Sequence, residues 1–254
     1  MEQYQLTNAS SQTKNDLAYR DEMTRHFSEA SGSVLDKLNN FTRFVSRQSL
    51  SKFLLKNEIF RQMHSIHGDI VECGVFHGGG LLTWAQLSAI YEPVNHTRKI
   101  VGFDTFEGLS PIKGQDRSLS PETFEHKEQG AYRFDRIDEL QESIRLFDLN
   151  RPVGHIPKVE LVKGDATLTI PKYLDENRHL VVALLYLDFD LYEPTKVALE
   201  HFLPRMPKGS VIAFDELNQK QWPGETLAVL EVVGIRNLRI QRLPYMPQIS
   251  FAVL

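Results

Sequence analysis

The apolar residues of this chain form short runs that alternate with helical patterns from Asp69 onward. These runs are rich in β-branched residues and are bounded by glycine or charged residues, as buried strands are. Such alternation is typical of βαβ units, in which helices cover both faces of a parallel sheet. The pattern therefore predicts a doubly wound α/β fold. The predicted strands are 69–73, 99–104, 158–164, 180–188 and 209–215, with helices near 81–90, 137–147 and 195–203.

Further elements are predicted on either side of this alternating region. At the carboxyl end, the runs 238–243 and 248–254 are joined by Pro-Tyr-Met-Pro and predict a closing hairpin. Two helices are predicted before the sheet, because apolar residues recur there at helical spacing. The first set is Val34, Leu35, Leu38, Phe41 and Val45, and the second is Leu54, Leu55, Ile59, Met63 and Ile66.

Two segments lack any apolar period. Residues 1 to about 30 are polar, which predicts an arm that is mobile or ordered only against a partner subunit, before a single domain at 31–254. Residues 105–134 are rich in glycine, proline, serine and charge. Loops of this length inside a compact domain are usually functional lids or disordered. We expect a lid at about 105–134, and a passive insertion is the alternative.

Composition limits the partners of the protein. A net charge of -4 over 254 residues, with a pI near 6.1, leaves no broad basic surface for nucleic acid. The lone Cys73 can form no intramolecular disulfide. The amino-terminal segment lacks the apolar centre of a signal peptide, and no run reaches the ~18 apolar residues of a membrane span. We expect a soluble cytoplasmic protein without a membrane partner.

The ends of the first three predicted strands carry acidic residues and glycines. Glu72 leads into a turn with Gly74, Gly78, Gly79 and Gly80, and the next two strands end at Asp104 and at Gly164-Asp165. Ligands of parallel α/β sheets bind at this edge, where an acid can accept hydrogen bonds from ribose. No basic residue is placed to hold a pyrophosphate, so a neutral or cationic nucleoside is favoured over a dinucleotide. A packing turn and capping acids are the alternatives.

A second group of acids follows the fourth and fifth strands. Asp188 and Asp190 share one face because side chains alternate along a strand, and Asp215 and Glu216 end the next strand. One crossover helix fits between these strands, which predicts that they are neighbours. Converging carboxylates repel one another unless a cation neutralises them or one stays protonated. An all-oxygen cluster suits Mg²⁺, Mn²⁺ or Ca²⁺ and not Zn²⁺. Solvated strand-end acids are the alternative.

Several segments resemble one enzyme family in their order and spacing. They are GDIVECGVFHGGG, VGFDTFEGLSP, YLDFDLYEPTKVALE, GSVIAFDE and WPGETLAV, and they span roughly residues 66–235. The resemblance is to the macrocin O-methyltransferase family, S-adenosylmethionine-dependent enzymes that methylate sugars in antibiotic biosynthesis. It implies a Rossmann-like class I methyltransferase sheet of seven strands, a Mg²⁺ (or Mn²⁺) site, a mobile lid and a small glycosylated acceptor. We also expect a homo-oligomer.

The resemblance also implies roles for individual residues. Asp190 falls on the proposed general base, and Asp188, Asp215 and Glu216 fall on the metal ligands. The family usually has Asp-Asp where this chain has Asp215-Glu216, so Glu216 can reach the metal directly or through water. Glu72, Gly74 and Gly78 match the methionine side of the cofactor site, and Asp104 matches its ribose-binding acid. The remaining residues expected at the cofactor are Val75, Gly79, Thr105, Phe106, Gly164, Asp165, Ala166 and Asp188.

Two other functions compete with this interpretation. The Asp-Phe-Asp at 188–190 also fits the D-x-D motif of a metal-dependent nucleotide-sugar glycosyltransferase, but only Lys196 is near enough to hold a phosphate. A methyltransferase-like module without activity would keep the fold but would not need the carboxylate cluster. Trp222 could stack on a sugar or aglycone, or it could only anchor a loop.

Overall fold

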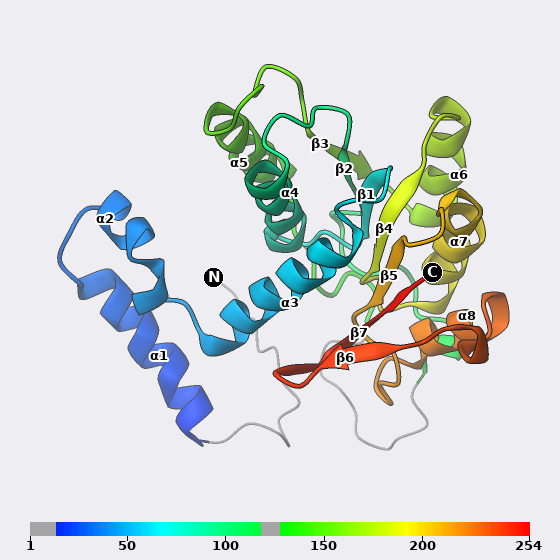
Figure 1. Ribbon diagram of the computed structural model, residues 1–254. Coiled ribbons are helices and arrows are strands. Elements are labelled where there is room, and N and C mark those ends of the chain that lie inside the picture. The colour runs from blue at the N-terminus through cyan, green and yellow to red at the C-terminus, as the bar shows by residue number, and fades with distance from the viewer. Residues whose placement is uncertain (1–13, 118–127) are drawn as a thin grey trace. The chain divides into compact units, whose positions relative to one another are not determined.

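One mixed seven-stranded sheet organises the protein, in the order β3-β2-β1-β4-β5-β7-β6. The computed structural model describes residues 14–117 and 128–254 (Figure 1). Strands β1 to β5 are parallel, whereas β7 runs antiparallel to both β5 and β6. This is the sheet of class I methyltransferases, with the expected closing hairpin. The strands are β1 Asp69–Cys73, β2 Ile100–Asp104, β3 Val159–Lys163, β4 Val182–Leu187, β5 Val211–Phe214, β6 Gln241–Leu243 and β7 Met246–Val253.

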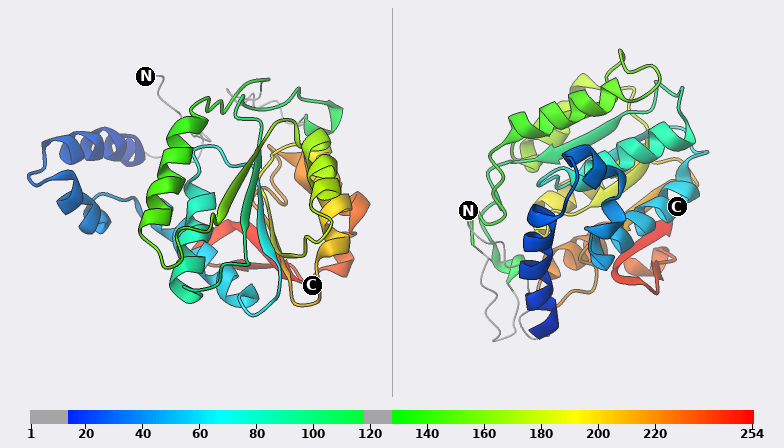
Figure 2. Two further views of the ribbon diagram at one scale, coloured as in Figure 1. Left: turned by 90° about the horizontal axis from the view of Figure 1, so that it is seen from above. Right: turned by 90° about the vertical axis from the view of Figure 1, so that its left-hand side faces the viewer.

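Helices cover both faces of this sheet, as the alternating pattern predicted. On one face pack the carboxyl-terminal part of α3, α4 and α5, and on the other pack α6, α7 and α8 (Figure 2). The α-helices are α1 Lys14–Glu29, α2 Val34–Asn39, α3 Arg47–Met63, α4 Gly79–Tyr91, α5 Ile137–Leu149, α6 Ala166–Glu176, α7 Tyr192–Phe202 and α8 Pro223–Val232. Short 3-10 helices occur at η1 Phe41–Arg43, η2 Gly114–Asp116, η3 Leu203–Arg205 and η4 Ile235–Asn237.

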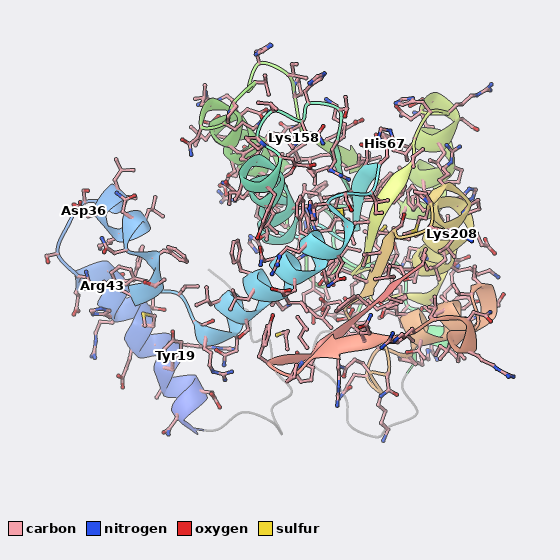
Figure 3. All side chains as sticks on the ribbon, viewed as in Figure 1. Tyr19, Asp36, Arg43, His67, Lys158 and Lys208 are labelled. Carbon is pink, nitrogen blue, oxygen red and sulfur yellow. The ribbon has the colours of Figure 1, made fainter. Side chains whose placement is uncertain are left out.

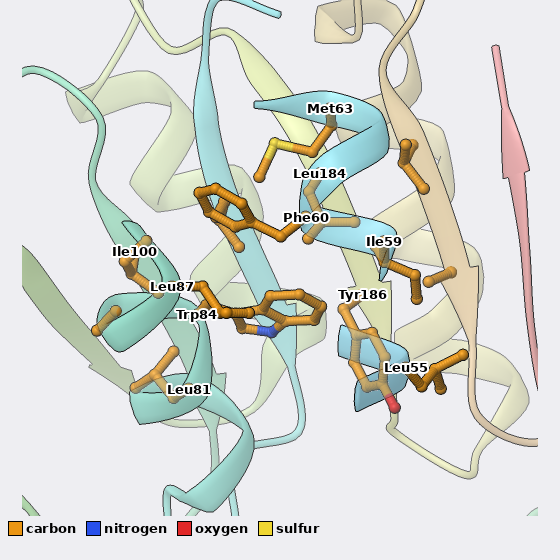
Figure 4. Packing of buried hydrophobic residues seen from close by; sticks show 14 of the residues in the cluster. Leu55, Ile59, Phe60, Met63, Leu81, Trp84, Leu87, Ile100, Leu184 and Tyr186 are labelled. Atoms are coloured by element: carbon orange, nitrogen blue, oxygen red, sulfur yellow. The ribbon is translucent and has the colours of Figure 1, made fainter. Parts of the chain in front are cut away.

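The centre of the sheet is apolar on both faces. All six residues of β4 are buried, with Leu184 and Tyr186 packed on one face and Leu185 and Leu187 on the other. The Tyr186 ring lies beside Trp84 of α4, 5.7 Å between centroids (Figure 4). Burial on both faces explains why this strand is a nearly continuous apolar run.

The contacts divide the chain into two units, residues 1–52 and 53–254. In the first unit, Ser33 and Asp36 form a capping box at the start of α2 (Asp36 is labelled in Figure 3). Val34 and Leu35 of α2 are 71% and 69% exposed. We expected a polar arm ending near residue 30. Residues 14–29 of it form α1, and residues 1–13 lie outside the described part.

In the second unit, buried polar contacts join the segments that precede β2 and β3. Lys158, just before β3, donates hydrogen bonds to the carbonyl oxygens of Asn95 (2.8 Å) and Arg98 (3.2 Å), before β2 (Lys158 is labelled in Figure 3). No helix in the described ranges is both long and apolar enough to cross a membrane. Of the expected lid at 105–134, residues 118–127 lie outside the described residues.

Candidate functional site

The glycine turn after β1 brings two strand ends into contact. Gly74 has φ 95°, and a Cβ there would lie 2.0 Å from the carbonyl oxygen of Asp188. Only glycine tolerates both the left-handed backbone and this close approach. The turn then leads into α4 at Gly79, where a Cβ would have no neighbour within 4 Å. The open space beside Gly79 lies at a helix amino terminus, in the region expected to hold a cofactor.

Glu72 lies beneath this turn in a buried ion pair. Its carboxylate is 3.4 Å from the Nζ of Lys56 on α3, and both side chains are almost fully buried. Burial raises the pKa of Glu72, and Lys56 opposes the rise. The Lys56 ammonium also lies 3.6 Å from the ring centroid of Tyr186. Through its contacts with Glu72 and with the Tyr186 ring, Lys56 links the end of β1 to the end of β4. The sequence did not predict Lys56 as a site residue.

Asp104 at the end of β2 ties together the loops that follow β1 and β2. Its Oδ2 accepts the backbone N–H groups of Val75 (2.7 Å) and Phe76 (2.9 Å). Its Oδ1 accepts the N–H of Phe106 at 2.6 Å. These bonds hold the predicted cofactor residues Val75 and Phe106 in place. Contact between Asp104 and a ribose stays a prediction.

Further residues expected at the cofactor follow the carboxyl ends of β2 and β3. Asp165 caps α6 by accepting the N–H of Thr167 at 2.9 Å, and Ala166 follows it in a buried position. Gly164, with φ 136°, makes the turn into the cap. Thr105 donates its hydroxyl to the carbonyl oxygen of Gly108 at 2.7 Å. Adenine recognition at Asp165 stays a prediction.

Three acids gather at the ends of β4 and β5, which are neighbouring parallel strands as predicted. The pairing of Leu187 with Phe214 places the next residues, Asp188 and Asp215, side by side. One carboxylate oxygen each of Asp188, Asp215 and Glu216 lies within 4.8 Å of the others. Oε2 of Glu216 is buried and has no hydrogen-bond partner among the described residues. Oxygen ligands at this spacing fit a hard divalent cation.

Two residues that the sequence analysis missed support this cluster from behind. The Tyr186 hydroxyl donates a hydrogen bond to Asp215. The fully buried Glu225 of α8 accepts the backbone N–H of Glu216 at 3.1 Å. Burial, reinforced by the neighbouring carboxylates, raises the pKa of both Glu216 and Glu225 well above the usual range. The alternation that placed Asp188 on one face of its strand also placed Tyr186 there, so a signal for Tyr186 existed.

Backbone strain is concentrated at this same edge of the sheet. A positive φ costs a residue with a side chain about 1–3 kcal/mol, and such strain gathers at functional sites. The loops after β1, β4 and β5 each hold one such residue, and the described part of the loop after β2 holds two: Phe76 (51°), Asp190 (62°) and Asn218 (67°), with Phe106 (55°) and Tyr132 (58°) after β2. Asp190 has this strained backbone two residues beyond Asp188, one of the three acids of the cluster.

Aromatic residues border the carboxylates. Tyr132 precedes α5, and its ring lies 6.2 Å from Phe76 and 6.5 Å from Trp222. Burial, together with the charges of Asp190, Glu216 and Asp188, raises the pKa of Tyr132 to about 12. Tyr132 therefore presents a neutral phenol near the acids. The loop that carries it shows no period, so no sequence signal pointed to it.

The loop after β2 is fastened to the start of α7. Asp116 of η2 is buried, and its Oδ1 accepts the N–H of Tyr192 at 2.6 Å. The same oxygen would lie 2.3 Å from a Cβ at Gly224, so α8 can approach only because this residue is glycine. Lys113 pairs with Glu193 nearby, which places Glu193 on the surface and outside the carboxylate cluster.

Comparison with known proteins gives one consistent result. A sequence profile described as macrocin-O-methyltransferase (TylF) matches residues 36–231. The crystal structure of CalS11, a calicheamicin methyltransferase, is 33% identical, covers 95% of this chain and 93% of its own, and has a TM-score of 0.90. An apo structure of CalS11, described as a TDP-rhamnose 3'-O-methyltransferase of calicheamicin biosynthesis, is also 33% identical. It covers 95% of each chain with a TM-score of 0.82.

More distant relatives have related names. A protein of Streptomyces olivaceus, 8-demethyl-8-(2,3-dimethoxy-alpha-L-rhamnosyl)-tetracenomycin-C 4'-O-methyltransferase, is 27% identical over 154 residues. That match covers 59% of this chain, which spans about half (53%) of the relative's length. The O-methyltransferase NovP, at 18% identity and a TM-score of 0.58, covers 83% of this chain and 81% of its own and shares the fold.

Proposed function

Because the chain belongs to the macrocin O-methyltransferase family, we propose that it uses S-adenosylmethionine and a divalent cation to methylate a sugar hydroxyl of a glycosylated natural product. The observation that carries this proposal is the contact between the glycine turn and the carboxylate cluster. Gly74 of the turn touches the backbone of Asp188, one of three acids that could hold a metal. A cofactor at the turn and a cation at these acids would therefore adjoin, as methyl transfer to a metal-held hydroxyl requires.

The residues around the glycine turn fit a cofactor that has a nucleoside and a positive charge but no phosphate. The space beside Gly79 would admit it, and the acids Glu72, Asp104 and Asp165 would face its charged and polar groups. When bound, S-adenosylmethionine supplies an electrophilic methyl group on a sulfonium ion. The buried Lys56 keeps Glu72 in place, since the ammonium and carboxylate are 3.4 Å apart.

Asp190 would collect the proton that the sugar hydroxyl gives up. A carboxylate alone is a poor base for this task, because the pKa of a model Asp is about 3.9 and that of water about 15.7. A divalent cation at Asp188, Asp215 and Glu216 would lower the hydroxyl pKa and orient its oxygen. Asp190 would accept the hydroxyl proton, and S-adenosylmethionine, when bound, would supply the methyl group that takes the place of that proton on the oxygen.

The acceptor is the finer part of the proposal. The names of CalS11 and of the Streptomyces olivaceus relative both specify rhamnose, as a nucleotide sugar in one and on an aglycone in the other. We therefore place a deoxyhexose first among candidate acceptors, with Tyr132 and Trp222 beside it. The surface pairing of Lys196 with Glu231 favours methyl transfer over glycosyl transfer, because Lys196 was the nearest group for a phosphate.

The oligomeric state and location also belong to this proposal. Exposed apolar residues of α2, including Val34 and Leu35, support a homo-oligomer. Sedimentation of the purified protein tests this, and a monomer at micromolar concentration would contradict it. A cytoplasmic location, without nucleic acid or membrane partners, is part of the same proposal and can be checked by cell fractionation.

Methyl transfer can be tested with labelled S-adenosylmethionine. Rhamnosylated aglycones and TDP-rhamnose are offered separately, with and without Mg²⁺, and product is measured after chelator treatment as a control. Calorimetry with S-adenosylhomocysteine and with NAD tests the cofactor directly. Tighter binding of NAD, or cofactor binding without transfer to any sugar, would contradict the proposal.

A further inference from the structure

Glu225 combines full burial with an incomplete set of partners. It is 0% exposed, and its Oε1 accepts the N–H of Glu216 at 3.1 Å. Its Oε2 is buried and has no hydrogen-bond partner within the described part of the chain. The described residues offer it no ion pair, so the carboxylate carries an uncompensated polar oxygen. Burial of this kind costs several kcal/mol unless something offsets it.

The position of Glu225 on α8 makes this arrangement unusual. It is the third residue of the helix, where a glutamate commonly turns back to cap its own helix. Here it reaches instead to the end of β5, and Trp222 at the cap position has no side-chain capping bond. The helix dipole favours an anion at this end by only about 0.3–1 kcal/mol when exposed, and up to about 2 kcal/mol when partly buried. Helix capping therefore does not explain why a glutamate is buried at this position.

Close packing holds Glu225 at this place. The neighbouring Gly224 presses α8 against the start of α7, since a Cβ there would lie 2.5 Å from the backbone nitrogen of Tyr192 and 2.3 Å from Asp116. Glu225 therefore cannot retreat toward solvent without separating the two helices. Its carboxylate is held near those of Asp215, Asp188 and Asp190, whose charges all act on it.

We infer that Glu225 is a positioning residue for a divalent cation, because its buried carboxyl group fixes the backbone of Glu216, one of the three acids that would hold the ion. This rests on the metal site of the proposed function. Glu225 lies outside the group whose oxygens approach within 4.8 Å of one another, so it acts through Glu216. Groups that hold metal ligands in place typically contribute about 10- to 100-fold to metal affinity.

The test measures the binding of Mg²⁺ and Mn²⁺ by calorimetry to the full chain in the absence of acceptor. Glu225→Leu removes the acceptor of the Glu216 N–H, whereas Glu225→Gln keeps both the acceptor and the shape of the side chain. We expect the metal affinity of Glu225→Leu to fall about 10- to 100-fold, and that of Glu225→Gln to stay near that of wild type. The metal-free melting temperature of Glu225→Gln should not fall, because the amide fills the same space. Glu231→Gln, at an exposed position of the same helix, is the matched control and should bind metal as wild type does.

Melting temperatures of both metal-free variants separate loss of the hydrogen bond from loss of overall stability. Metal binding by a folded Glu225→Leu within twofold of wild type would overturn the inference, as would Glu225→Gln binding metal no more tightly than Glu225→Leu. If wild type binds neither cation while still binding S-adenosylhomocysteine, the metal part of the proposed function fails as well. Those two failures are therefore distinguishable.

Discussion

Replacing Gly79 by alanine should weaken cofactor binding without weakening the fold. A Cβ at this position meets nothing within 4 Å, and the residue begins α4. Alanine in a helix is favoured over glycine by up to about 1 kcal/mol, so the free energy of unfolding should stay level or rise slightly. The added methyl group would occupy the space assigned to S-adenosylmethionine.

Gly74→Ala is the contrasting variant, because its surroundings are closed. Its Cβ would lie 2.0 Å from the Asp188 carbonyl oxygen, at φ 95°. The left-handed backbone costs about 1–2 kcal/mol, and overpacking adds about 1–3 kcal/mol. A total of about 2–5 kcal/mol is a large share of the roughly 5–15 kcal/mol that stabilises a typical domain.

Urea unfolding and calorimetry with S-adenosylhomocysteine separate the two effects. Gly79→Ala should unfold at the wild-type midpoint or above and lose at least about tenfold in affinity, equivalent to about 1.4 kcal/mol. Gly74→Ala should unfold at a clearly lower urea concentration. Unchanged affinity in Gly79→Ala would refute the cofactor position, and wild-type stability in Gly74→Ala would refute the close contact with Asp188.

Three further predictions concern the acids, the aromatic border and a buried lysine. Asp188→Asn or Asp215→Asn should lower metal affinity, with turnover partly restored by excess Mg²⁺, because each loses a charged ligand. Asp190→Asn should bind metal and cofactor but lose roughly 10²- to 10⁴-fold in turnover, and a rescue by Mg²⁺ would make Asp190 a ligand. Tyr132→Ala should raise the KM for the sugar roughly tenfold (about 1.4 kcal/mol) while S-adenosylhomocysteine binds normally; an unchanged KM would remove Tyr132 from the acceptor site. Burial lowers the pKa of Lys158 from 10.5 to about 8, so the unfolded chain binds more protons between these pH values and the free energy of unfolding should rise with pH across them. Urea titrations of wild type and Lys158→Met test this, and equal pH slopes would contradict it.

The sheet and its strand-end acids could be predicted because they depend on short-range patterns. Alternating β-branched runs located the five parallel strands, and the short gap between the fourth and fifth predicted their pairing. Helices α6 and α8 were not predicted. Pro171 lies inside α6, and α8 opens with Pro223-Gly224, so residues that usually break helices obscured both.

The missed site residues depend on contacts between distant parts of the chain. Glu225 returns to the end of β5 only because α8 begins beside it, and that helix was not expected. Lys56 lies on a helix whose apolar period was predicted, but its pairing with Glu72 follows from how α3 packs on the sheet. Tyr132 lies in a segment where neither helical nor strand spacing constrains the side chains. Position on the chain did not indicate any of these three contacts.

The anchoring of Asp116 has a consequence for engineering acceptor specificity. Exchanging the whole connection between β2 and α5 would remove the carboxylate that holds the start of α7 and fits against Gly224. A graft that begins at Arg117 would keep this fastening and leave the two helices in register. Loop libraries drawn from relatives should therefore be joined after Asp116. Chimeras cut before that residue serve as the comparison, and we expect them to give less folded protein.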